Sequence, residues 1–493
     1  MKGQTHSERC TLEVLTPLHV GSGELLCIGM DYVEKDGKPF VVDQARTFDA
    51  VAEGNAPLEE MIRKAPGLKD LVTMAGDHYG YGLSCFSKSA VCPQNIRECV
   101  KDAFYRPYVP GSSLKGAIRT ALVAEFLRKA NSEVFKHYVP NWKLDPKNPK
   151  KKLPSERPHF AAQKLMHRIL GKDPKQDIMR ALHVGDAMFN AADIKLTNVQ
   201  WLNIIWDKAA QREQVAWRDM AFHKSVSDWR KAGGQAVEAL APQSLGPVSL
   251  QWDGFLLSKP EQWQERGQQD LLPPTFDELR DKLNTHAHHR LDAEIAFHKK
   301  CRYRPAEEQC KLLKDRIEKD TEGAYLQLAW GTGWRGMTGD WLSNEDMENM
   351  RKMYKLGKGF YDKKAAEWRP IWPFPKTRRL AVDDQPRWPL GWVCLWQESV
   401  AESRLAGFNK KGLVRHPWLE ETVKRLAEQI HCSDEEVLRG KRLAEYWQAL
   451  EDSDVKQAVL KDIRSCWEER GWWNNPTGRA IKKAKAIYEG KRS

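Results

Sequence analysis

Residues 109–119 have the types and spacing of an anion-binding segment. They read Val-Pro-Gly-Ser-Ser-Leu-Lys-Gly-Ala-Ile-Arg, so a Pro-Gly break precedes serines that can cap a helix. The free N–H groups of a first helical turn would face a phosphate, and the two cations, four residues apart, would share one helix face. The predicted contacts are Gly111, Ser112, Ser113, Lys115 and Arg119. The alternative is an ordinary capped helix with two solvated cations.

A second segment, residues 330–339, reads Trp-Gly-Thr-Gly-Trp-Arg-Gly-Met-Thr-Gly. It matches Gly-x-Gly-x-x-Gly, but a dinucleotide site needs a helix opening at the third glycine, and we expect the loop to run through 338–341 before any helix. A glycine-rich loop between two tryptophans suits instead the close approach of a nucleic-acid backbone. The predicted contacts are Gly331, Gly333 and Arg335. The alternative is a tight turn packed on core tryptophans.

Titratable side chains elsewhere do not form a catalytic set. His19 lies in the strand-ending turn Thr-Pro-Leu-His-Val-Gly-Ser-Gly at 16–23, where a structural histidine is the simpler interpretation. Residues 285–289 contain three histidines without the His-Glu-x-x-His spacing of a zinc site, which predicts a solvated helix face. Asp186 could be a general base, but the sequence supplies no partner. We predict no catalytic residue, no metal site and no cofactor.

Positive charge gathers in two regions of the chain. The 493 residues include 79 Lys and Arg against 67 Asp and Glu, a net charge of +12. Residues 101–180 hold 18 basic against 7 acidic side chains, and residues 351–400 hold 11 against 5. Clustered cations favour a polyanion because binding releases its condensed counterions. The Lys-rich run at 147–152 is the exception, since it predicts a flexible, solvated loop.

The composition is that of a globular protein of the cytoplasm. Hydrophobic residues make up 41% and charged residues 30%, which excludes disordered and collagen-like chains. No stretch approaches about 18 consecutive apolar residues, and no secretory signal opens the sequence, so we expect no membrane partner. The ten cysteines are scattered without zinc-site spacing and predict reduced thiols. Twenty tryptophans offer stacking surfaces as well as core.

Hydrophobic periodicity predicts a mixture of strands and helices followed by a purely helical part. Strand patterns occupy 11–15, 28–33, 39–42, 181–184, 199–206 and 325–330. Helical patterns occupy 57–65, 114–129, 160–170 and 276–319, the last broken near Pro305. From residue 398 onward the pattern is helical only, which predicts a separate helical module over 398–493.

Five motifs in order carry a family resemblance. They are the segments at 16–23, 109–119 and 331–338, Pro-Lys-Thr-Arg-Arg at 375–379 and Pro-Leu-Gly-Trp-Val at 389–393. Together they resemble the RAMP superfamily of CRISPR effector proteins, and most closely the subunits that cap the filament of the type III-A (Csm) complex. The resemblance covers 1–397 and implies that this part is an RNA-binding region with an inserted loop around 140–158 and a helical segment around 275–320. Residues 398–493 have no counterpart in the family pattern.

The resemblance implies a ferredoxin-like, RRM-related α+β fold whose sheet and glycine-rich loop hold RNA. It implies a non-catalytic subunit that binds the 3′ region of the crRNA, supports crRNA maturation in antiviral defence and contacts other Csm/RAMP subunits. Target RNA is a further candidate partner. The resemblance adds His19, Lys376, Arg378 and Arg379 to the predicted RNA contacts.

Two other functions stay open from the sequence. One is an endoribonuclease that processes crRNA with His19 as acid or base. The other is a different type III RAMP subunit, in the filament or at the 5′ handle. For the helical module we expect contacts within the complex or with a partner, and its basic end at 479–493 could add weak RNA contact.

Overall fold

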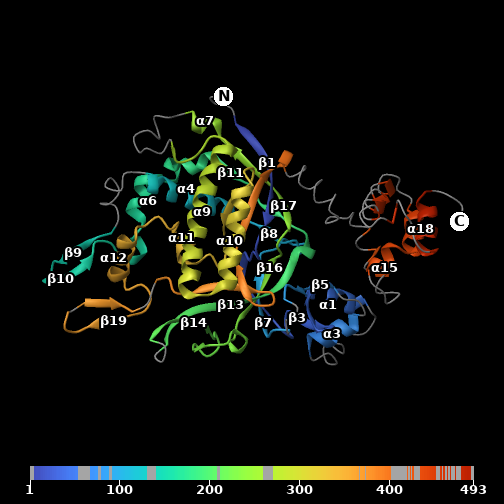
Figure 1. The fold of residues 1–493 in the computed structure, drawn as a ribbon, viewed down its shortest axis with the longest axis horizontal. Coiled ribbons are helices and arrows are strands. Elements are labelled where there is room, and N and C mark those ends of the chain that lie inside the picture. Colours follow the sequence, from blue (N-terminus) through green and yellow to red (C-terminus); the bar gives the residue numbers. More distant parts are fainter. Residues whose placement is uncertain are drawn as a thin grey trace. The chain divides into compact units, whose positions relative to one another are not determined.

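The computed structural model divides into two compact units, Met1–Gln397 and Glu398–Ser493, which are described separately (Figure 1). In the first unit it describes residues 5–53, 67–75, 79–87, 92–129, 140–207, 211–258, 270–365, 367–371 and 374–397. In the second it describes 398–400, 419, 422–423, 425–426, 434–450, 456–457, 459–460, 463–464, 467, 472–473 and 479–489.

The first unit is built on a five-stranded antiparallel sheet. Its order is β11–β17–β1–β23–β18. The strands are β1 (His6–Val14), β11 (Leu182–Val184), β17 (Leu245–Trp252), β18 (Ala324–Gln327) and β23 (Trp392–Gln397). β1 is central, because it pairs with β17 on one side and with β23 on the other. In β1 every second residue, Cys10, Leu12 and Val14, is buried in the core.

Helices cover the core face of this sheet. The helices that pack in this core are α4 (Gly111–Lys129), α6 (Gln163–Leu170) and α9 (Phe276–Cys301), whereas α10 (Arg304–Lys319) packs against α9. Leu114 and Ile118 of α4 and Leu279 and Leu283 of α9 pack in the same core as β1. α9 and α10 lie side by side, in yellow in Figure 1. Thr275 caps α9, because its hydroxyl accepts a hydrogen bond from the Glu278 N–H at 3.3 Å. α10 begins at Arg304 and has Pro305 in its first turn.

A second, nine-stranded sheet carries the other half of the first unit. Its strands are β2 (Gly21–Cys27), β6 (Ser84–Cys85), β7 (Asn95–Cys99), β13 (Ile194–Asp207), β14 (Arg212–Arg218), β15 (Ser225–Val226), β16 (Gln235–Leu240), β21 (Arg378–Val382) and β22 (Pro386–Pro389). The long strand β13 pairs with β16, β21 and β14 along its length. β13 and β21 therefore bring residues near 200 beside residues near 380.

Smaller elements surround the two sheets. They are β3 (Tyr32–Lys35), β4 (Lys38–Val42), β5 (Gly80–Gly82), α1 (Gln44–Glu53), α3 (Leu68–Ala75), β8 (Tyr108–Val109), β9 (Trp142–Asp145), β10 (Asn148–Pro154), β12 (Ala187–Met188), α7 (Gly254–Leu257), α11 (Gly333–Thr338), α12 (Asn344–Tyr354), β19 (Gly359–Asp362) and β20 (Glu367–Pro370). Short 3-10 helices lie at Pro158–Phe160, Pro174–Gln176, Ile178–Ala181, Ala191–Asp193 and Trp229–Lys231.

The second unit has its own hydrophobic core. Its helices with defined bounds are α15 (Asp434–Leu438), α16 (Lys441–Gln448) and α18 (Arg479–Tyr488). Leu419, Val423 and Leu426 and also Val459, Ile463 and Trp467 are buried together in this core. The second unit therefore has core residues on both sides of α15 and α16 along the chain.

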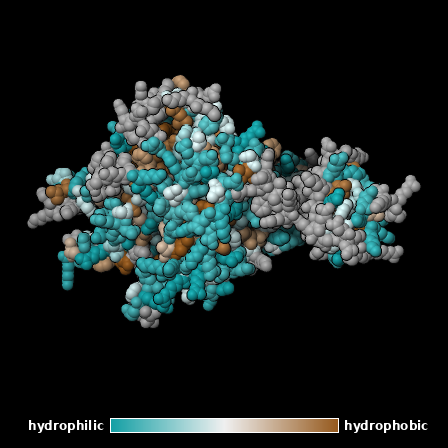
Figure 2. Space-filling view, turned by 45° about the horizontal axis from the view of Figure 1, so that its top comes forward, coloured by the Kyte–Doolittle hydropathy of each residue, from teal (hydrophilic) through white to brown (hydrophobic). Residues whose placement is uncertain are grey.

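The structure shows a mixed fold of helices and strands, as predicted, but corrects one predicted loop. The run at 147–152 lies largely in the hairpin β9–β10. The helix predicted at 57–65 lies outside the described residues. None of the helices in the described part of the chain is long and apolar enough to span a membrane. On the face shown in Figure 2, the described surface is mostly hydrophilic with scattered hydrophobic patches.

Candidate nucleic-acid interface

The first turn of α4 is already hydrogen-bonded. The Gly111 N–H donates to Asp186 Oδ1 at 2.6 Å, and the N–H groups of Ser113 and Leu114 donate to the Pro110 carbonyl at 2.9 and 3.1 Å. The prediction that this turn offers four free amides to a phosphate is therefore wrong. Asp186, which lacked a partner in the sequence, is the acceptor that ties the start of α4 to the segment after β11.

Lys115 and Arg119 do share one face of α4, as their spacing predicted. Arg119 Nη2 lies 3.8 Å from Asp177 Oδ2, and the Arg119 side chain is 44% exposed. Burial lowers the pKa of Lys115, with Asp177 acting to raise it and Arg119 to lower it. Two cations thus face one carboxylate. The remaining positive charge suits an anion at this surface, close to the exposed Ser112.

The glycine-rich loop docks on the same helix. Gly339 has φ +83°, and a Cβ built on it would lie 3.0 Å from Ala124 Cβ and 3.2 Å from the Thr120 carbonyl. From α4, Arg128 Nη2 donates to the carbonyls of Gly339 and Asp340 at 3.1 and 2.9 Å. The two strongest sequence motifs, more than two hundred residues apart, are therefore neighbours on one surface.

The loop differs in detail from its prediction. Residues 333–338 form the short helix α11, so the expectation of no helix before residue 341 is wrong. Arg335 forms an ion pair with Asp340, which also receives Arg290 Nη1 at 3.3 Å. At Gly331, φ is +104° and a Cβ would lie 2.6 Å from Leu390 Cδ1, whereas a Cβ at Gly333 would meet nothing within 4 Å. Arg335 and Gly331 thus shape the loop, and Gly333 is its open position.

A cavity of about 580 Å³ lies where α4 and the loop meet. It is lined by Gly116 and Arg119 of α4 and by Trp334, Met337 and Trp341 from the loop side. Met337 is 77% exposed. Arg119 is therefore next to aromatic and thioether side chains as well as to Lys115.

Arg378 is a structural residue. Its Nε donates to Glu294 Oε2 at 2.5 Å, and its guanidinium lies 3.7 Å from the centre of the Phe297 ring. Arg290, which is 2% exposed, lies on the other side of Glu294, with Nη2 at 3.7 Å from Oε1. Burial acts to raise the pKa of Glu294, but the charges of Arg378 and Arg290 lower it to about 2. The predicted RNA contact at Arg378 does not fit this buried network.

Arg379, the next residue of β21, points to the opposite side, as alternation in a strand requires. Its guanidinium carbon lies 4.5 Å from the centre of the Trp201 ring and 4.6 Å from that of Trp330. Arg97 of β7 lies 5.8 Å from the Trp330 ring. These residues and Gln200 line a cavity of about 700 Å³, which we call the arginine notch. The remaining predicted contact in this segment, Lys376, donates to the Ile204 carbonyl at 3.3 Å.

His19 supports the notch from inside the protein. It is 2% exposed, and its Nδ1 donates to the Glu238 carbonyl at 2.7 Å. Burial lowers its pKa to about 4, the Glu238 bond opposes this, and Arg97 and Lys101 reinforce it. The imidazole meets the Trp330 ring edge-on at 5.5 Å. Direct RNA contact by His19 is contradicted by this burial, and its place is behind Trp330.

The histidines of 285–289 also differ from prediction. His286 is buried in α9, 3.3 Å from Arg128 Nη1 and 3.7 Å from Glu125 Oε1. The predicted solvated face is wrong for His286, because this side of α9 packs on α4. Within the described ranges, no group of three His, Cys, Asp or Glu side chains could hold a metal ion.

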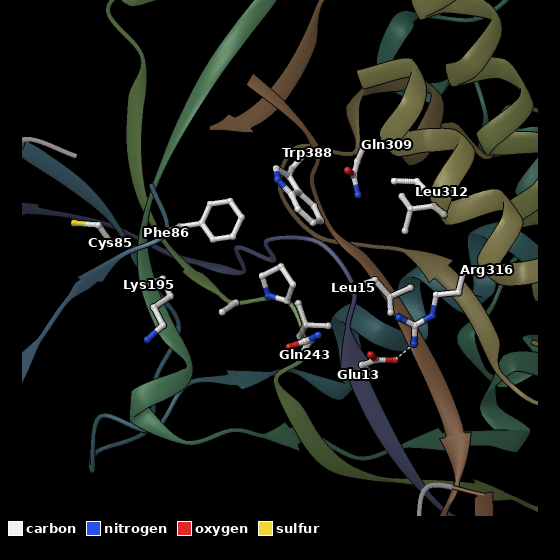
Figure 3. Close-up of a pocket in the computed structure, with 14 residues that line it drawn as sticks. Glu13, Leu15, Cys85, Phe86, Lys195, Gln243, Gln309, Leu312, Arg316 and Trp388 are labelled. Carbon is white, nitrogen blue, oxygen red and sulfur yellow. Dashed lines mark hydrogen bonds and ion pairs between the residues drawn. The ribbon is translucent and has the colours of Figure 1, made fainter. Parts of the chain in front are cut away.

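Another cavity, of about 490 Å³, is lined by residues of β1, β6, β13 and α10 (Figure 3). Its two cations are already bonded: Arg316 pairs with Glu13, and Lys195 Nζ donates to Ser84 Oγ at 2.7 Å. The lining also includes Leu312 and Trp388. This cavity offers less to an anion than the arginine notch does.

The sequence reasoning missed Arg97, Gln200 and Trp201. One signal was available for Arg97, since alternation in β7 buries Ile96 and turns its neighbour to the other face. The decisive arrangement is the register that pairs Trp201 with Arg379. Such pairing between strands that are distant in the sequence cannot be predicted from local sequence patterns.

Comparison with known proteins agrees with the motifs. The sequence model described as "RAMPs: RAMP superfamily" matches residues 11–223. The predicted resemblance to the RAMP superfamily is confirmed. A Streptococcus thermophilus protein described as "CRISPR system Cms protein Csm5" is 27% identical over 142 residues. This match covers 25% of the present chain and 40% of that relative. The chain is therefore similar to Csm5 over a limited segment.

Two solved structures are also similar. A chain of the cryo-EM Csm–crRNA–target RNA ternary complex of a type III-A system has a TM-score of 0.49 at 24% identity, covering 79% of this chain and 100% of its own. The crystal structure of T. onnurineus Csm5 has a TM-score of 0.47 at 22% identity, covering 78% of this chain and 99% of its own.

Proposed function

We propose that the protein is a non-catalytic RNA-binding subunit of a type III-A Csm effector complex, which caps the 3′ region of the crRNA and supports its maturation. The observation that carries the proposal is the meeting of two motif segments on one basic surface, where α11 and its loop dock on α4 beside Lys115 and Arg119. The sequence similarity to Csm5 supports the same assignment. Neighbouring Csm/RAMP subunits and target RNA are the other expected partners.

We assign the five-stranded sheet to the ferredoxin-like arrangement. Along the chain the elements run β1, α4, β11, β17, α9 and β23, and in space the strands run β11–β17–β1–β23 with antiparallel neighbours. This is the strand order of a split βαβ pair. α10 and β18 are additions to it.

A double variant tests the RNA surface. The affinity of the full chain for a single-stranded guide RNA is measured over a salt series for wild type and for Lys115→Ala with Arg119→Ala. Loss of two phosphate contacts should weaken binding and reduce the slope of log affinity against log salt by about 1.4. The matched control is Lys299→Ala with Lys319→Ala, two exposed lysines of α9 and α10. Equal affinity and slope in both double variants would refute the contact surface.

The alternatives make different predictions. A processing endoribonuclease would cut repeat RNA in EDTA and lose the activity in His19→Ala, but the burial of His19 speaks against that role. A filament or 5′-handle subunit would cross-link to the other end of the guide. Cross-linking to guides labelled at each end, together with sequencing of the RNA that copurifies, separates these possibilities.

A further inference from the structure

Two arginines of the second sheet, Arg97 and Arg379, line the arginine notch without an acidic partner in its lining. Among the residues that the structure describes, neither Arg97 nor Arg379 has an ion-pair partner, and the Nε atom of each is buried without a hydrogen bond. This contrasts with Arg378 and Arg335, each of which has a carboxylate. The notch therefore holds two positive charges and no compensating negative one.

Such an arrangement is unfavourable in the free protein. Burial lowers the pKa of Arg379, and the charge of Arg97 lowers it further. Arginine nevertheless stays protonated at neutral pH, so the repulsion persists unless an anion enters. A half-buried pair of like charges in a cavity does not stabilise the fold, but it is suited to binding an anionic ligand.

The geometry also restricts the ligand. The Arg379 guanidinium lies close to the rings of Trp201 and Trp330, and its N–H groups form a planar fork. That fork matches a phosphate or carboxylate. Nearby, Trp201 Nε1 is a buried donor without a partner, and the Gln200 side chain, 7% exposed, has an oxygen without one.

The cavity of about 700 Å³ is large enough for a nucleotide, and its lining continues to Trp229. A bare phosphate at neutral pH offers little to the Gln200 oxygen, whereas a ribose hydroxyl or a base amino group can donate to it. The indole rings in its lining suit the bases that accompany a phosphodiester.

We propose that the arginine notch binds a ribonucleotide phosphate between Arg97 and Arg379, carried by single-stranded RNA. This rests on the proposed RNA-binding function and adds a second contact surface on the nine-stranded sheet, separate from α4. A free mononucleotide is the other source of the same chemistry.

The test uses the full chain and the variants Arg97→Gln, Arg379→Gln and Arg379→Lys. The control is Lys319→Gln, which removes the same charge from the exposed end of α10. Affinity for a single-stranded RNA oligonucleotide is measured over a salt series. Each glutamine variant should bind about tenfold more weakly, with a slope smaller by about 0.7, and Arg379→Lys should keep the slope but lose affinity.

A stability readout separates binding from folding. Because Arg97→Gln relieves a repulsion, its melting temperature without ligand should equal or exceed that of wild type. Uridine 5′-monophosphate at millimolar concentration should raise the melting temperature of wild type and not that of either glutamine variant.

The outcomes are distinct for the two proposals. If wild type binds RNA through Lys115 and Arg119 while the notch variants bind as wild type does, the notch proposal is overturned and the proposed function stands. If wild type binds no RNA but the mononucleotide stabilises it through the notch, the notch is a nucleotide site and the proposed function fails. If neither ligand distinguishes the variants, the notch binds no nucleotide and the notch proposal is overturned. A notch that binds only a protein partner would give this third result.

Discussion

A single buried carboxylate holds together the charges between α9 and β21. Glu294 lies between Arg290 and Arg378, and all three side chains are largely removed from solvent. Buried ion pairs add little net stability, but removing one partner leaves the others uncompensated. Glu294 is therefore a point at which one substitution should have a large effect.

We predict that Glu294→Gln lowers the free energy of unfolding by about 3–5 kcal/mol, measured by urea denaturation. The matched control is Glu318→Gln on α10, whose carboxylate is 53% exposed and should cost less than about 1 kcal/mol. Similar midpoints for the two variants would contradict the network.

His19 should make stability depend on pH. Its pKa of about 4 in the folded protein lies below the ordinary 6.5, so folding favours the neutral form. The contribution of His19 to the free energy of unfolding is complete above pH 6.5. As the pH falls towards 4 this contribution is lost, and the free energy of unfolding decreases by about 3 kcal/mol. His286 and His298, whose pKa values are also lowered by burial, add to the same trend.

The variant His19→Asn can keep a donor to the Glu238 carbonyl without titrating. Between pH 6.5 and 4, the free energy of unfolding of this variant should fall less steeply with decreasing pH than that of wild type. The difference in slope corresponds to about one bound proton. Parallel curves for the two proteins would show that His19 does not titrate with folding.

Individual residue roles were only partly readable from sequence. Alternation places Arg378 and Arg379 on opposite faces of a strand, but it does not say which face meets Glu294 and which meets two tryptophans. Likewise, an isolated His19 gave no sign of the carbonyl it bonds. Both answers depend on tertiary neighbours.

At the scale of elements, the start of α4 is fixed by close contact with β11. A Cβ built on Gly111 would lie 2.1 Å from the Val184 carbonyl, whereas one built on Gly116 in the same helix meets nothing within 4 Å. Only Gly111 is therefore required for packing, although both glycines belong to one motif.

Alanine substitutions should show this difference. Gly111→Ala must push α4 away from β11 and should destabilise by about 1–3 kcal/mol. Gly116→Ala should stabilise by about 0.5–1 kcal/mol, because alanine favours a helix interior. Thermal unfolding of the two variants measures the effects, and a stabilising Gly111→Ala would contradict the contact.

Strongly periodic elements were predictable, and charge-rich ones were not. The apolar stripe of 114–129 and the break near Pro305 correspond to α4 and to the junction of α9 and α10. The lysines of 147–152 gave no hydrophobic pattern, so the hairpin β9–β10 was missed. Its strands pair through the backbone, which leaves little trace in side-chain type.

At the scale of the whole chain, two units have separate hydrophobic cores. Both proposed RNA surfaces, on α4 and on the second sheet, lie in the first unit. A chain ending at Gln397 should therefore fold and bind guide RNA within about twofold of the full-length affinity. Circular dichroism and the same salt series measure this, and lost binding in a folded fragment would assign RNA contact to 398–493.

The central place of β1 has a consequence for synthesis of the protein. β1 is made long before β23, and one of its edges is completed only by β23, at residues 392–397. Until then the nascent chain carries a strand with unpaired backbone groups, which invites pairing with other chains. Translation that stops before residue 392 should thus yield fragments that depend on chaperones or aggregate.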